Sequence, residues 1–596
     1  MLFGKHINRY YLRYSYALII GLIALVAVDY IQLIVPRLYQ TVVNGINDGY
    51  VMVDGVKKVF DMDFLLEEVC KPFIFIIISM VFGRFLWRIC FFGTALKVET
   101  SLRERMFDHC KDLSQQFYQV NKVGNLMSLF TNDLETVQDC FGSGVLMLCD
   151  AVFLGALAIY RMSQMNILLT LFSLVPMIFL LVIGLILSKY LRLKWETRQE
   201  AFSSLSDFSQ ESFGGIAVIK AFVKEAKELG AFRKLNKENE DANVEYTRLS
   251  VKLNISVTLF VESVICVILG YGGYLVYKHV FNAGQLVEFI GYFTAVVWPV
   301  MAVSQLIEMR SRGRASLDRI SKLLEEKVDV FDKEGVTDRG ELKGNITFND
   351  LTFRYPGGSY DVLKNISLDI KAGDNIGIVG RVGCGKTTLV DLILRTYNIP
   401  DGKIFLDGND INDIPIKTVR KYSAYVPQDN FLFSDTIRNN IAFATDVSSK
   451  EEIEEVEKAA EYADVHNNIR SFPEKYMTVL GERGVTVSGG QKQRISIARA
   501  LMKNAAILIL DDSVSAVDVK TEKKILSNLK SIRKGKTTIL IAHRITTVKE
   551  MDKVVFMDDG RIVAFGTHNE LYETCPDYRN MVELQKLDDE ASGNGR

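Results

Sequence analysis

The stretch NIGIVGRVGCGKTTLV, residues 375–390, decides the fold of the second half of the chain. It holds the pattern G-x-x-x-x-G-K-[ST] between an apolar run that predicts a buried strand and a segment that predicts a helix, the context that this motif requires. Glycines let backbone N–H groups turn inward around phosphates, and the helix N-terminus adds a positive pole. The residues that we expect to bind a nucleotide are Gly380, Arg381, Val382, Gly383, Cys384, Gly385, Lys386, Thr387 and Thr388.

Two of these residues have separate expected roles. Lys386 reaches the β- and γ-phosphates, and the hydroxyl of Thr387 holds Mg²⁺. A second run, AAILILDD, predicts a strand from Ile507 to Leu510 that is buried on both faces and ends at Asp511. Because the carboxyl ends of parallel strands meet at one edge of a sheet, we expect Asp511 beside the glycine-rich loop as a further Mg²⁺ ligand.

Residues 341–586 alternate short β-rich runs with helical segments. The runs include NITFNDLTFRY, SAYVPQ, TTILIAHR and KVVFMDDGRIVAFG. This pattern predicts an α/β domain of the P-loop type with a largely parallel sheet. A charged linker, residues 326–340, precedes the domain, and residues 587–596 have so little apolar content that we expect a disordered tail.

The first half of the chain has a different character. The 596 residues are 48% hydrophobic and 24% charged, and the apolar excess lies almost entirely before residue 310. It forms runs near the length of about 20 residues that a helix needs to cross a membrane. We expect an all-α transmembrane domain over residues 1–325 with six spans, at about 16–38, 72–92, 140–162, 164–187, 255–277 and 286–307.

Lysine and arginine counts predict the orientation of these spans. Residues 1–15, 93–139 and 188–254 together hold 20 of them, whereas residues 39–71 and 278–285 hold 4. Since basic loops stay on the cytoplasmic side, we expect the N-terminus and the second domain in the cytoplasm, and the chain in the cytoplasmic membrane. The long basic loops are helix-prone, so they predict membrane helices that continue into the cytoplasm.

Charge and cysteine content exclude several classes of protein. Lysine plus arginine, 71, balances aspartate plus glutamate, 72, which disfavours a nucleic-acid partner. The eight cysteines include no C-x-x-C pair, so neither a zinc site nor a disulfide scaffold is indicated. Cys384 stands in the glycine-rich loop near Lys386, and we expect this electropositive setting to favour its reactive thiolate.

The stretch VTVSGGQKQR carries a resemblance to a known family. Its residues Ser488, Gly489, Gly490 and Gln491 resemble the signature motif of ATP-binding cassette (ABC) proteins, and they stand between the glycine-rich loop and Asp511 as that family requires. In this family the signature of one cassette completes the ATP site of an opposing cassette. The resemblance therefore implies that ATP and Mg²⁺ are bound between two chains, and that this chain is half of a dimeric transporter.

Further segments resemble the family in order along the chain. The single residues are Tyr355, similar to the aromatic that stacks on adenine, Gln428, similar to the Q-loop glutamine that also ligates Mg²⁺, Ser515 and Asp518, similar to D-loop residues, and His543, similar to the switch histidine. Gly481-Glu482-Arg483-Gly484 resembles the segment before the signature in exporters. The membrane half resembles an exporter domain, and residues 211–222 are similar to its second coupling helix.

One position departs from the family's pattern. The residue after the Mg²⁺ aspartate is normally a glutamate that acts as general base, but here it is Asp512. A base displaced by about 1 Å costs on the order of a hundredfold in rate, so we expect this site to bind ATP well and hydrolyse it slowly. The signature is nearly regular, with Val487 in place of the usual leucine. The chain thus resembles the degenerate-site half of bacterial heterodimeric multidrug ABC exporters.

Ionisable residues inside spans are costly and usually face a cavity, so each is a candidate for the transport path. These residues are Asp29, Arg84, Arg88, Asp150 and Glu262. For the two arginines the alternative is a position near the inner membrane surface, where long side chains reach water.

We expect an ABC-type ATPase that drives export of hydrophobic or amphipathic compounds, partnered in the membrane by a second half-transporter with the glutamate base. Two alternatives stay open, a homodimeric exporter of lipid or peptide and a nucleotide-gated channel or regulatory subunit. A partner chain with glutamate at the base position separates the heterodimer from the homodimer.

Overall fold

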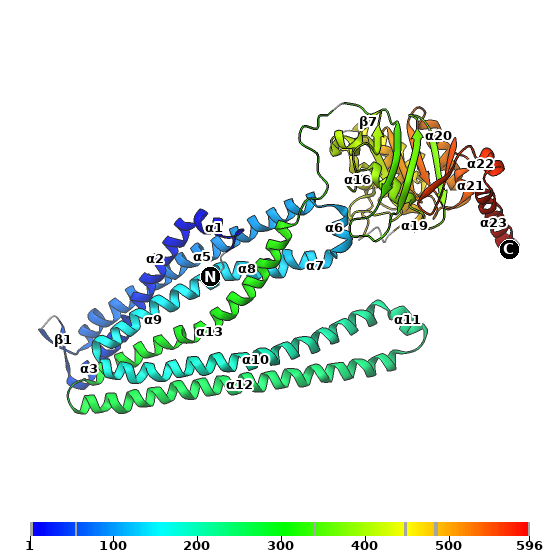
Figure 1. The fold of residues 1–596 in the computed structure, drawn as a ribbon. Helices are drawn as coiled ribbons and strands as arrows, with labels where there is room; N and C mark the ends of the chain where they lie inside the picture. The colour runs from blue at the N-terminus through cyan, green and yellow to red at the C-terminus, as the bar shows by residue number, and fades with distance from the viewer. Residues whose placement is uncertain (1–3, 54–55, 339, 446–449, 482–486, 594–596) are drawn as a thin grey trace. The chain divides into compact units, whose positions relative to one another are not determined.

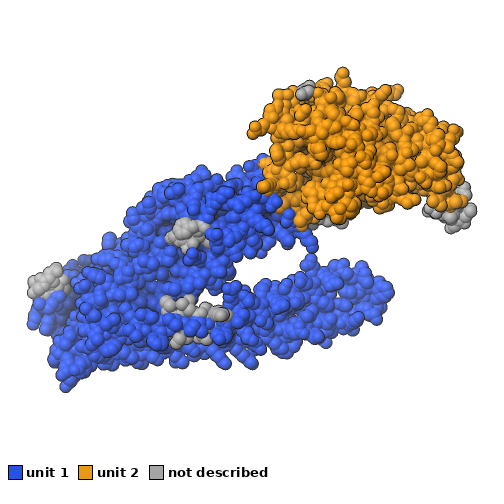
Figure 2. Space-filling model, viewed as in Figure 1, with its two compact units in different colours: residues 1–111, 121–326 blue, residues 112–120, 327–596 orange. Residues whose placement is uncertain are grey.

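The computed structural model describes residues 4–53, 56–338, 340–445, 450–481 and 487–593, and the chain divides into two compact units (Figures 1 and 2). Unit 1 comprises residues 1–111 and 121–326, and unit 2 comprises residues 112–120 and 327–596. The division after residue 326 falls at the start of the predicted linker. Residues 112–120 lie within a predicted cytoplasmic loop of the membrane half, yet they belong to unit 2.

Unit 1 is built of helices, with one short antiparallel hairpin, β1 (Tyr50–Val53) and β2 (Val56–Val59), among its described residues. Its helices are α1 (Asn8–Arg13), α2 (Ser15–Gln32), α3 (Val35–Asp48), α4 (Met62–Phe64), η1 (Leu65–Cys70), α5 (Lys71–Asp112), α7 (Val123–Ser128), η2 (Leu129–Asp133), α8 (Leu134–Asp139), η3 (Cys140–Gly144), α9 (Val145–Met165), α10 (Ile167–Gly214), α11 (Ile216–Ala221), α12 (Glu225–Tyr277) and α13 (Ala283–Glu325).

Within the described residues, five helical stretches are long and apolar enough to cross a membrane. They are Ser15–Asp48, Met62–Asp112, Val123–Met165, Glu225–Tyr277 and Ala283–Glu325. The predicted fourth span, residues 164–187, falls in α10, where a shorter apolar stretch is described, Ile167–Phe179. The six predicted runs therefore all fall in helices, five of which meet the length and hydropathy of a span.

The helices continue well beyond the apolar runs, as the helix-prone loops predict. Helices α10 and α12 run side by side, and the short α11 closes their far end (Figure 1). Between α9 and α10 the chain turns at Asn166, whose side-chain oxygen accepts a hydrogen bond from the N–H of Leu169 at 2.9 Å. This cap starts α10 and gives the predicted hairpin of the third and fourth spans.

Unit 2 contains the remaining elements. They are α6 (Gln115–Val120), β3 (Ile346–Phe353), β4 (Leu363–Ile370), β5 (Asn375–Gly380), α14 (Lys386–Ile393), β6 (Ile404–Leu406), β7 (Asn409–Asp410), η4 (Ile411–Asp413), α15 (Ile416–Lys421), β8 (Ser423–Val426), α16 (Ile437–Ile441), η5 (Ala442–Ala444), α17 (Lys450–Tyr462), α18 (His466–Arg470), η6 (Lys475–Met477), α19 (Gly489–Met502), β9 (Ile507–Asp511), α20 (Val519–Ile532), β10 (Thr537–Ile541), α21 (Ile545–Val548), β11 (Lys553–Asp558), β12 (Arg561–Gly566), α22 (His568–Thr574) and α23 (Pro576–Gly593).

Two sheets organise unit 2. The larger has the strand order β12-β11-β5-β10-β9-β8, in which only the edge strand β12 is antiparallel to its neighbour. This sheet confirms the predicted parallel core. The second sheet, β4-β3-β6-β7, is antiparallel, so the run NITFNDLTFRY does not belong to the parallel sheet. Its burial alternates along much of β3, which is typical of a strand with one covered face.

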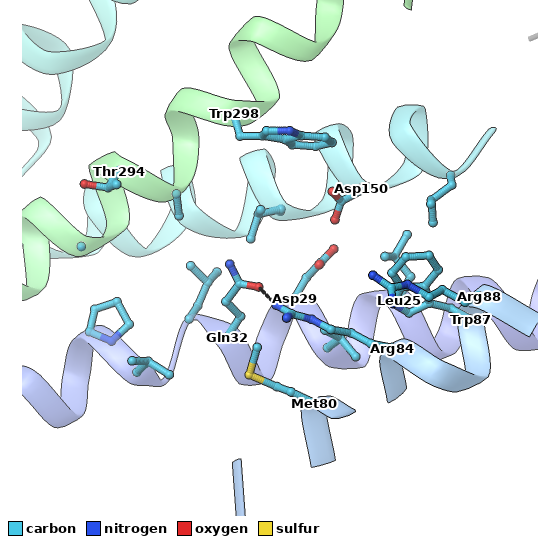
Figure 3. A pocket seen from close by; sticks show the side chains of 18 of the residues that line it. Leu25, Asp29, Gln32, Met80, Arg84, Trp87, Arg88, Asp150, Thr294 and Trp298 are labelled. Carbon is cyan, nitrogen blue, oxygen red and sulfur yellow. Dashed lines mark hydrogen bonds between the residues drawn. The ribbon is translucent and has the colours of Figure 1, made fainter. Parts of the chain in front are cut away.

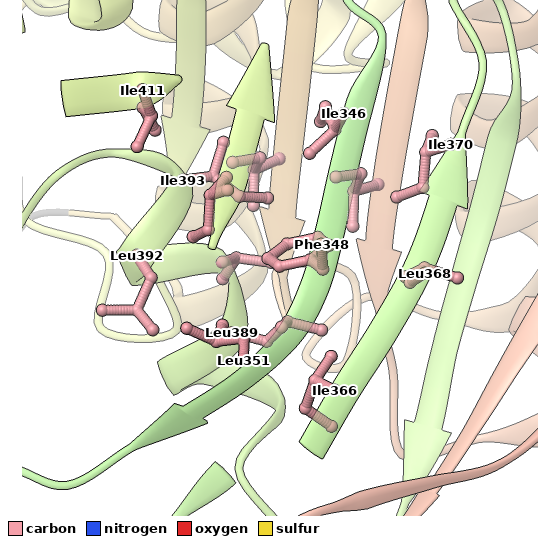
Figure 4. Close-up of a cluster of buried hydrophobic side chains, with 14 of the residues drawn as sticks. Ile346, Phe348, Leu351, Ile366, Leu368, Ile370, Leu389, Leu392, Ile393 and Ile411 are labelled. Atoms are coloured by element: carbon pink, nitrogen blue, oxygen red, sulfur yellow. The ribbon is translucent and has the colours of Figure 1, made fainter. Parts of the chain in front are cut away.

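The core under the glycine-rich loop lies between the antiparallel sheet and α14 (Figure 4). Phe348 and Leu351 of β3 and Ile366 of β4 pack with Leu389 and Ile393 of α14, and all five are buried. The core holds α14 in place through its apolar face. The loop that precedes α14 is thereby fixed at its C-terminal end.

The structure corrects the predicted tail. Helix α23 continues through residues 587–593, and residues 594–596 lie outside the described part of the chain. Its upstream residues Tyr578 and Val582 are buried against unit 2. Because adding residues to an existing helix costs far less than starting one, the helix extends through residues of low apolar content.

Candidate nucleotide site and membrane cavity

The expected nucleotide residues emerge at one edge of the parallel sheet. Strands β5, β10, β9 and β8 are consecutive neighbours, and Ile541 of β10 pairs with Ile378 on one side and Asp511 on the other. Val426 of β8 pairs with Leu510 in the same register. The chain segments that leave these strands carry the glycine-rich loop, His543, Asp512 and Gln428. Ligands of open α/β sheets bind at this edge.

The glycine-rich loop, residues 380–387, is called here the phosphate loop. Gly385 caps α14 with φ +97°, and a Cβ there would stand 2.7 Å from Leu363 Cδ2, so no other residue fits without strain. The buried Lys386 donates from Nζ to the carbonyl oxygens of Gly380 at 2.9 Å and Arg381 at 2.8 Å. Val382 at the outer turn is 87% exposed. The loop is therefore anchored from inside and open toward solvent.

Carboxylates crowd beside Thr387. Asp511 is buried and accepts a hydrogen bond from the Thr387 hydroxyl. Burial raises the pKa of Asp511, the hydrogen bond from Thr387 opposes this shift, and the charge of Asp512 adds to it. Burial also raises the pKa of Asp391 to about 6, with a further contribution from Asp511. A divalent cation would relieve this repulsion, so the residues present fit Mg²⁺.

These residues fit a magnesium site in which nucleotide phosphates supply the remaining ligands. In the described residues no cluster of three or more His, Cys, Asp or Glu side chains could hold a metal ion alone. Mg²⁺ in nucleotide sites takes one or two protein oxygens and fills its octahedron with phosphates and waters. Thr387 and Asp511 supply such oxygens. The exposed Gln428 lies two residues beyond β8 at the same sheet edge, and its carbonyl accepts from Asn430 Nδ2 at 3.3 Å.

Tyr355 stands next to the phosphate loop. Its hydroxyl shares a hydrogen bond of 2.7 Å with Thr388 Oγ1, and its ring lies edge-on to Tyr397 with 5.2 Å between ring centroids. The hydroxyl of Tyr397 donates to Gln119 Oε1 of α6 at 3.2 Å. Contacts through Tyr397 and Tyr355 thus connect α6 with the first turn of α14.

Asp512 adopts a left-handed conformation with φ +46°, which aspartate tolerates better than most residues. Its N–H donates to the carbonyl of Ile541 at 2.9 Å, and its carbonyl accepts from Ser515 Oγ at 2.9 Å. Asp518 caps α20 by accepting from the N–H groups of Lys520 and Thr521 at 3.1 and 3.0 Å. The D-loop residues Ser515 and Asp518 therefore each fix local backbone, Ser515 at Asp512 and Asp518 at the start of α20.

The signature residues begin α19. Ser488 Oγ accepts from the N–H of Gln491 at 3.3 Å, and Gln491 Oε1 accepts from the N–H of Ser488 at 3.0 Å, a reciprocal cap. A Cβ on Gly490 would stand 2.9 Å from the carbonyl oxygen of Ala516, whereas a Cβ on Gly489 would meet nothing within 4 Å. The fold thus requires glycine at 490 but not at 489. Glu482, Arg483 and Gly484 of the exporter-like segment lie outside the described residues.

Two glutamines were missed by the sequence analysis. Buried Gln493 of α19 accepts from the N–H of Ala516 at 3.0 Å and reaches Ser515 Oγ at 3.5 Å, which ties the signature helix to the D-loop. Gln585 of α23 donates to the carbonyl of His543 at 2.7 Å and accepts from the N–H of Ile545 at 2.8 Å. A polar residue on the buried face of α19 was a usable signal for Gln493. No local sequence pattern indicates the contacts of Gln585.

The expected reactivity of Cys384 is wrong. The side chain is 5% exposed, and burial raises the pKa of its thiol, although Lys386 opposes the shift. Desolvation disfavours the thiolate more than the nearby ammonium favours it. Cys384 is a small packing residue of the loop.

In the membrane half, one cavity of about 810 Å³ gathers most of the candidate transport residues (Figure 3). Asp29 of α2, Arg84 and Arg88 of α5 and Asp150 of α9 all line it. Glu262 does not: it is exposed on α12, which packs along α10 and away from α2 and α5. Glu262 stays a candidate for the transport path, on a different helix from the residues that line this cavity.

Comparisons with known proteins agree with this arrangement. The family described as "ABC transporter transmembrane region" matches residues 18–300, and the family described as "ABC transporter" matches residues 363–515. A probable multidrug resistance ABC transporter ATP-binding/permease protein, YheI of Bacillus subtilis (strain 168), is 35% identical over 587 residues, which cover 98% of this chain and 97% of that protein. The chain belongs to the ABC transporters.

Other relatives of this ABC transporter extend over its full length as well. The multidrug resistance-like ATP-binding protein MdlA of Escherichia coli (strain K12) is 34% identical over 584 residues, 97% of this chain and 96% of that protein. A solved structure of a bacterial Atm1-family ABC exporter with ATP bound shares the fold, with a TM-score of 0.75 at 24% identity over 97% of this chain and 99% of that chain. The match to the transmembrane region falls mostly in unit 1, and the match to the ABC transporter family lies in unit 2.

Proposed function

We propose that the protein is one half of a heterodimeric exporter that moves hydrophobic or amphipathic compounds outward across the cytoplasmic membrane. We further propose that the ATP site on its own phosphate loop is the slow one of two. The observation that carries the second statement is Asp512, which follows Asp511 at the end of β9 in a site that is otherwise intact. Relatives with names that refer to multidrug resistance support the first.

In this proposal the phosphate-loop N–H groups and Lys386 bind the β- and γ-phosphates. Thr387, Asp511 and Gln428 hold Mg²⁺, which neutralises charge on the phosphates when it is bound. Asp512 is the general base toward the attacking water, and His543 contacts the γ-phosphate from the end of β10. Because the Asp512 side chain is one methylene short of the family's glutamate, the base does not reach the position at which proton transfer is fast.

Two surfaces of this chain favour the proposal that a second chain binds to it. The signature residues Ser488 to Gln491 start a helix whose positive end faces open space at Gly489. The tip formed by α11 and its flanks is strongly apolar yet exposed, with Phe213, Val218, Phe222 and Val223 at 75%, 60%, 69% and 80%. Exposed apolar clusters of this kind mark contact sites. The signature fits the ATP of a partner cassette, and the tip fits a surface on that partner.

Coupling between ATP and transport would use the contacts inside unit 2. Tyr355 stacks on adenine, and its ring touches Tyr397, which is hydrogen-bonded to Gln119 of α6. Ordering of Tyr355 by nucleotide therefore bears on α6, from which the chain runs on into unit 1. The N-terminus and the cassette lie in the cytoplasm in this proposal, where ATP is available.

The test is a nucleotide count per chain in the assembled complex. The protein is purified together with a half-transporter that has glutamate at the position of Asp512, incubated with radioactive 8-azido-ATP and Mg²⁺ for many turnovers, and then irradiated. We expect label to remain as ATP on this chain and as ADP on the partner. Equal label and equal hydrolysis on both chains would overturn the two-site assignment, and rapid hydrolysis by this chain alone would favour a homodimer.

A further inference from the structure

A buried carboxylate packs against the segment that carries His543. Glu522 lies in the first turn of α20 and is only 5% exposed, although glutamate is almost always found at the surface unless it is paired. Taking a carboxylate out of water is costly unless its oxygens have partners. The partners of Glu522 therefore indicate what the residue does.

Both carboxylate oxygens of Glu522 reach residues that follow His543. The hydroxyl of Thr547, a buried residue of α21, donates to Oε1, and Arg544 Nη1 lies 3.8 Å from Oε2. Arg544 is the next residue after His543, and Thr547 lies four residues beyond His543. Glu522 thus contacts the segment at two points, one before and one after Ile545.

The carboxylate is itself fixed to the start of α20. The N–H of Glu522 donates to the carbonyl of Asp518 at 2.9 Å, and Asp518 caps this helix directly after the D-loop. The contacts of Glu522 with Arg544 and Thr547 therefore connect the first turn of α20 with the segment in which His543 stands.

The other contacts of α21 are of a different kind. Val548 packs on β5, where a Cβ on Gly377 would lie 2.8 Å from Val548 Cβ, and Gln585 bonds to backbone groups of His543 and Ile545. Apolar packing has no preferred direction, whereas hydrogen bonds to a charged group do. A buried ion pair adds little net stability, because the loss of hydration offsets the attraction. We therefore expect the contacts of Glu522 to affect orientation more than stability.

We propose that Glu522 is a positioning residue for His543: it holds Arg544 and Thr547 so that the imidazole stays aligned with the γ-phosphate of ATP on this chain's phosphate loop. Glu522 touches neither ATP nor the attacking water, and it acts through His543. The inference rests on the proposed function in one respect, the contact of His543 with the γ-phosphate. It extends that function to a residue outside the nucleotide site.

The variants test the two contacts of the carboxylate. Thr547→Val keeps side-chain shape and removes the hydroxyl that donates to Glu522, and Thr547→Ser returns a hydroxyl as the rescue variant. Thr546→Val is the matched control, because it makes the same change at the exposed neighbouring residue of α21. Glu522→Gln removes the charge that faces Arg544. His543→Ala gives the size of the effect when the imidazole is lost.

Hydrolysis is followed on this chain within the full complex with a partner half-transporter. The complex is loaded with Mg²⁺ and 8-azido-ATP that is radioactive at either the α- or the γ-phosphate, and excess nucleotide is removed. The sample is then warmed, and portions are irradiated over several hours before the two chains are separated. The α label on this chain reports bound nucleotide, and the loss of γ label relative to α label reports hydrolysis. Thermal unfolding checks that each variant is folded.

We expect Thr547→Val and Glu522→Gln to slow the loss of γ label from this chain by about tenfold and to leave the initial α label unchanged. A displaced imidazole slows the reaction, whereas the phosphate loop still binds ATP. Thr547→Ser should recover most of the rate, and Thr546→Val should match the parent protein. Adding Thr547→Val to His543→Ala should cause no further slowing, since residues that act as a unit are not additive.

Several results would overturn the inference. A rate equal to that of the parent protein in both Thr547→Val and Glu522→Gln would do so. A fall in the initial α label as large as the fall in rate would mean that these residues are structural. Further slowing by about tenfold when Thr547→Val is added to His543→Ala would mean that Thr547 does not act through His543. A parent protein that keeps all of its γ label would leave no reaction for His543 to assist.

Failure of the inference and failure of the proposed function give different results. If His543→Ala slows hydrolysis and Thr547→Val does not, His543 keeps its proposed role and Glu522 has none. If His543→Ala is as fast as the parent protein, the proposed role of His543 fails, and the positioning role fails with it. Equal loss of γ label from both chains contradicts the slow site, while the ratio between Thr547→Val and the parent protein still tests Glu522.

Discussion

The phosphate-loop side and the signature side of the cassette differ in how far this chain surrounds them. Lys386 and Asp511 are buried, and both have hydrogen-bond partners within the same chain. The signature residues are capped only by one another, and the space in front of Gly489 is open. The first side is therefore fixed by its own fold, and the open second side fits the proposal that its ligand comes from another chain.

The largest expected effect is on the open side. Gly489→Asp should abolish steady-state ATPase of the assembled complex, because in the proposed dimer it puts a negative charge beside the γ-phosphate of the ATP bound by the partner. The fold should tolerate the change, since the position has room and a carboxylate in the first turn of a helix is favourable. Gly489→Ala is the control and should keep activity. ATPase assays and thermal unfolding of both variants check this prediction. Full ATPase activity in Gly489→Asp would contradict the proposed role of the signature in ATP hydrolysis.

The next effect is on the enclosed side. Lys386→Ala should weaken ATP binding to this chain by about a hundredfold, because charge-assisted bonds to two phosphates are lost. Photolabelling of each chain of the complex measures it. Lys530→Ala is the control, since that lysine makes only a surface ion pair with Asp552. If the label on the partner falls by the same factor as the label on this chain, the two sides are not separate sites.

A smaller effect is expected at the segment that holds the switch histidine. Gln585→Leu keeps side-chain volume and removes both hydrogen bonds to the backbone around His543. We expect kcat to fall by up to about tenfold with little change in ATP affinity, since His543 is displaced and the phosphate loop is not. The neighbouring exposed Lys586→Ala should have no effect on kcat. A fall in ATP affinity as large as the fall in kcat would contradict this, since the phosphate loop would then be disturbed as well; thermal unfolding of the variant checks that the protein is folded.

The smallest effect is expected for the cysteine of the loop. Cys384→Ser should leave ATP binding nearly unchanged, because a small side chain is all that the loop needs. Maleimide at neutral pH should label the exposed Cys70 well before the buried Cys384, whose thiol has a raised pKa. Mass spectrometry of time points resolves the two sites. Faster labelling of Cys384 would restore the expectation of a reactive thiolate.

The same contrast explains what the sequence could predict. The phosphate loop, its strand and its helix are contiguous, so local chemistry specifies them, and the apolar strand before Asp511 could be recognised in the same way. The hydrogen bond from Gln585 to His543 joins residues 42 positions apart, so no local sequence pattern predicts it. That Asp29 and Asp150 line one cavity depends on which membrane helices pack together, which hydropathy does not encode. The extended helix α23 depends on upstream burial that composition does not reveal.

The account depends most on Asp512, and the variant Asp512→Glu tests it most directly. It restores the family's base at this chain's phosphate loop, with Asp512→Asn as the control that keeps side-chain length and removes charge. ATPase is measured on the purified chain alone and on the complex with a partner. In the complex we expect total ATPase to rise by less than about twofold, because in the proposed heterodimer the partner's site already has a glutamate base and provides most of the turnover. A rise of about tenfold or more in the chain alone would contradict the account, since both sites of a homodimer would then have gained a working base.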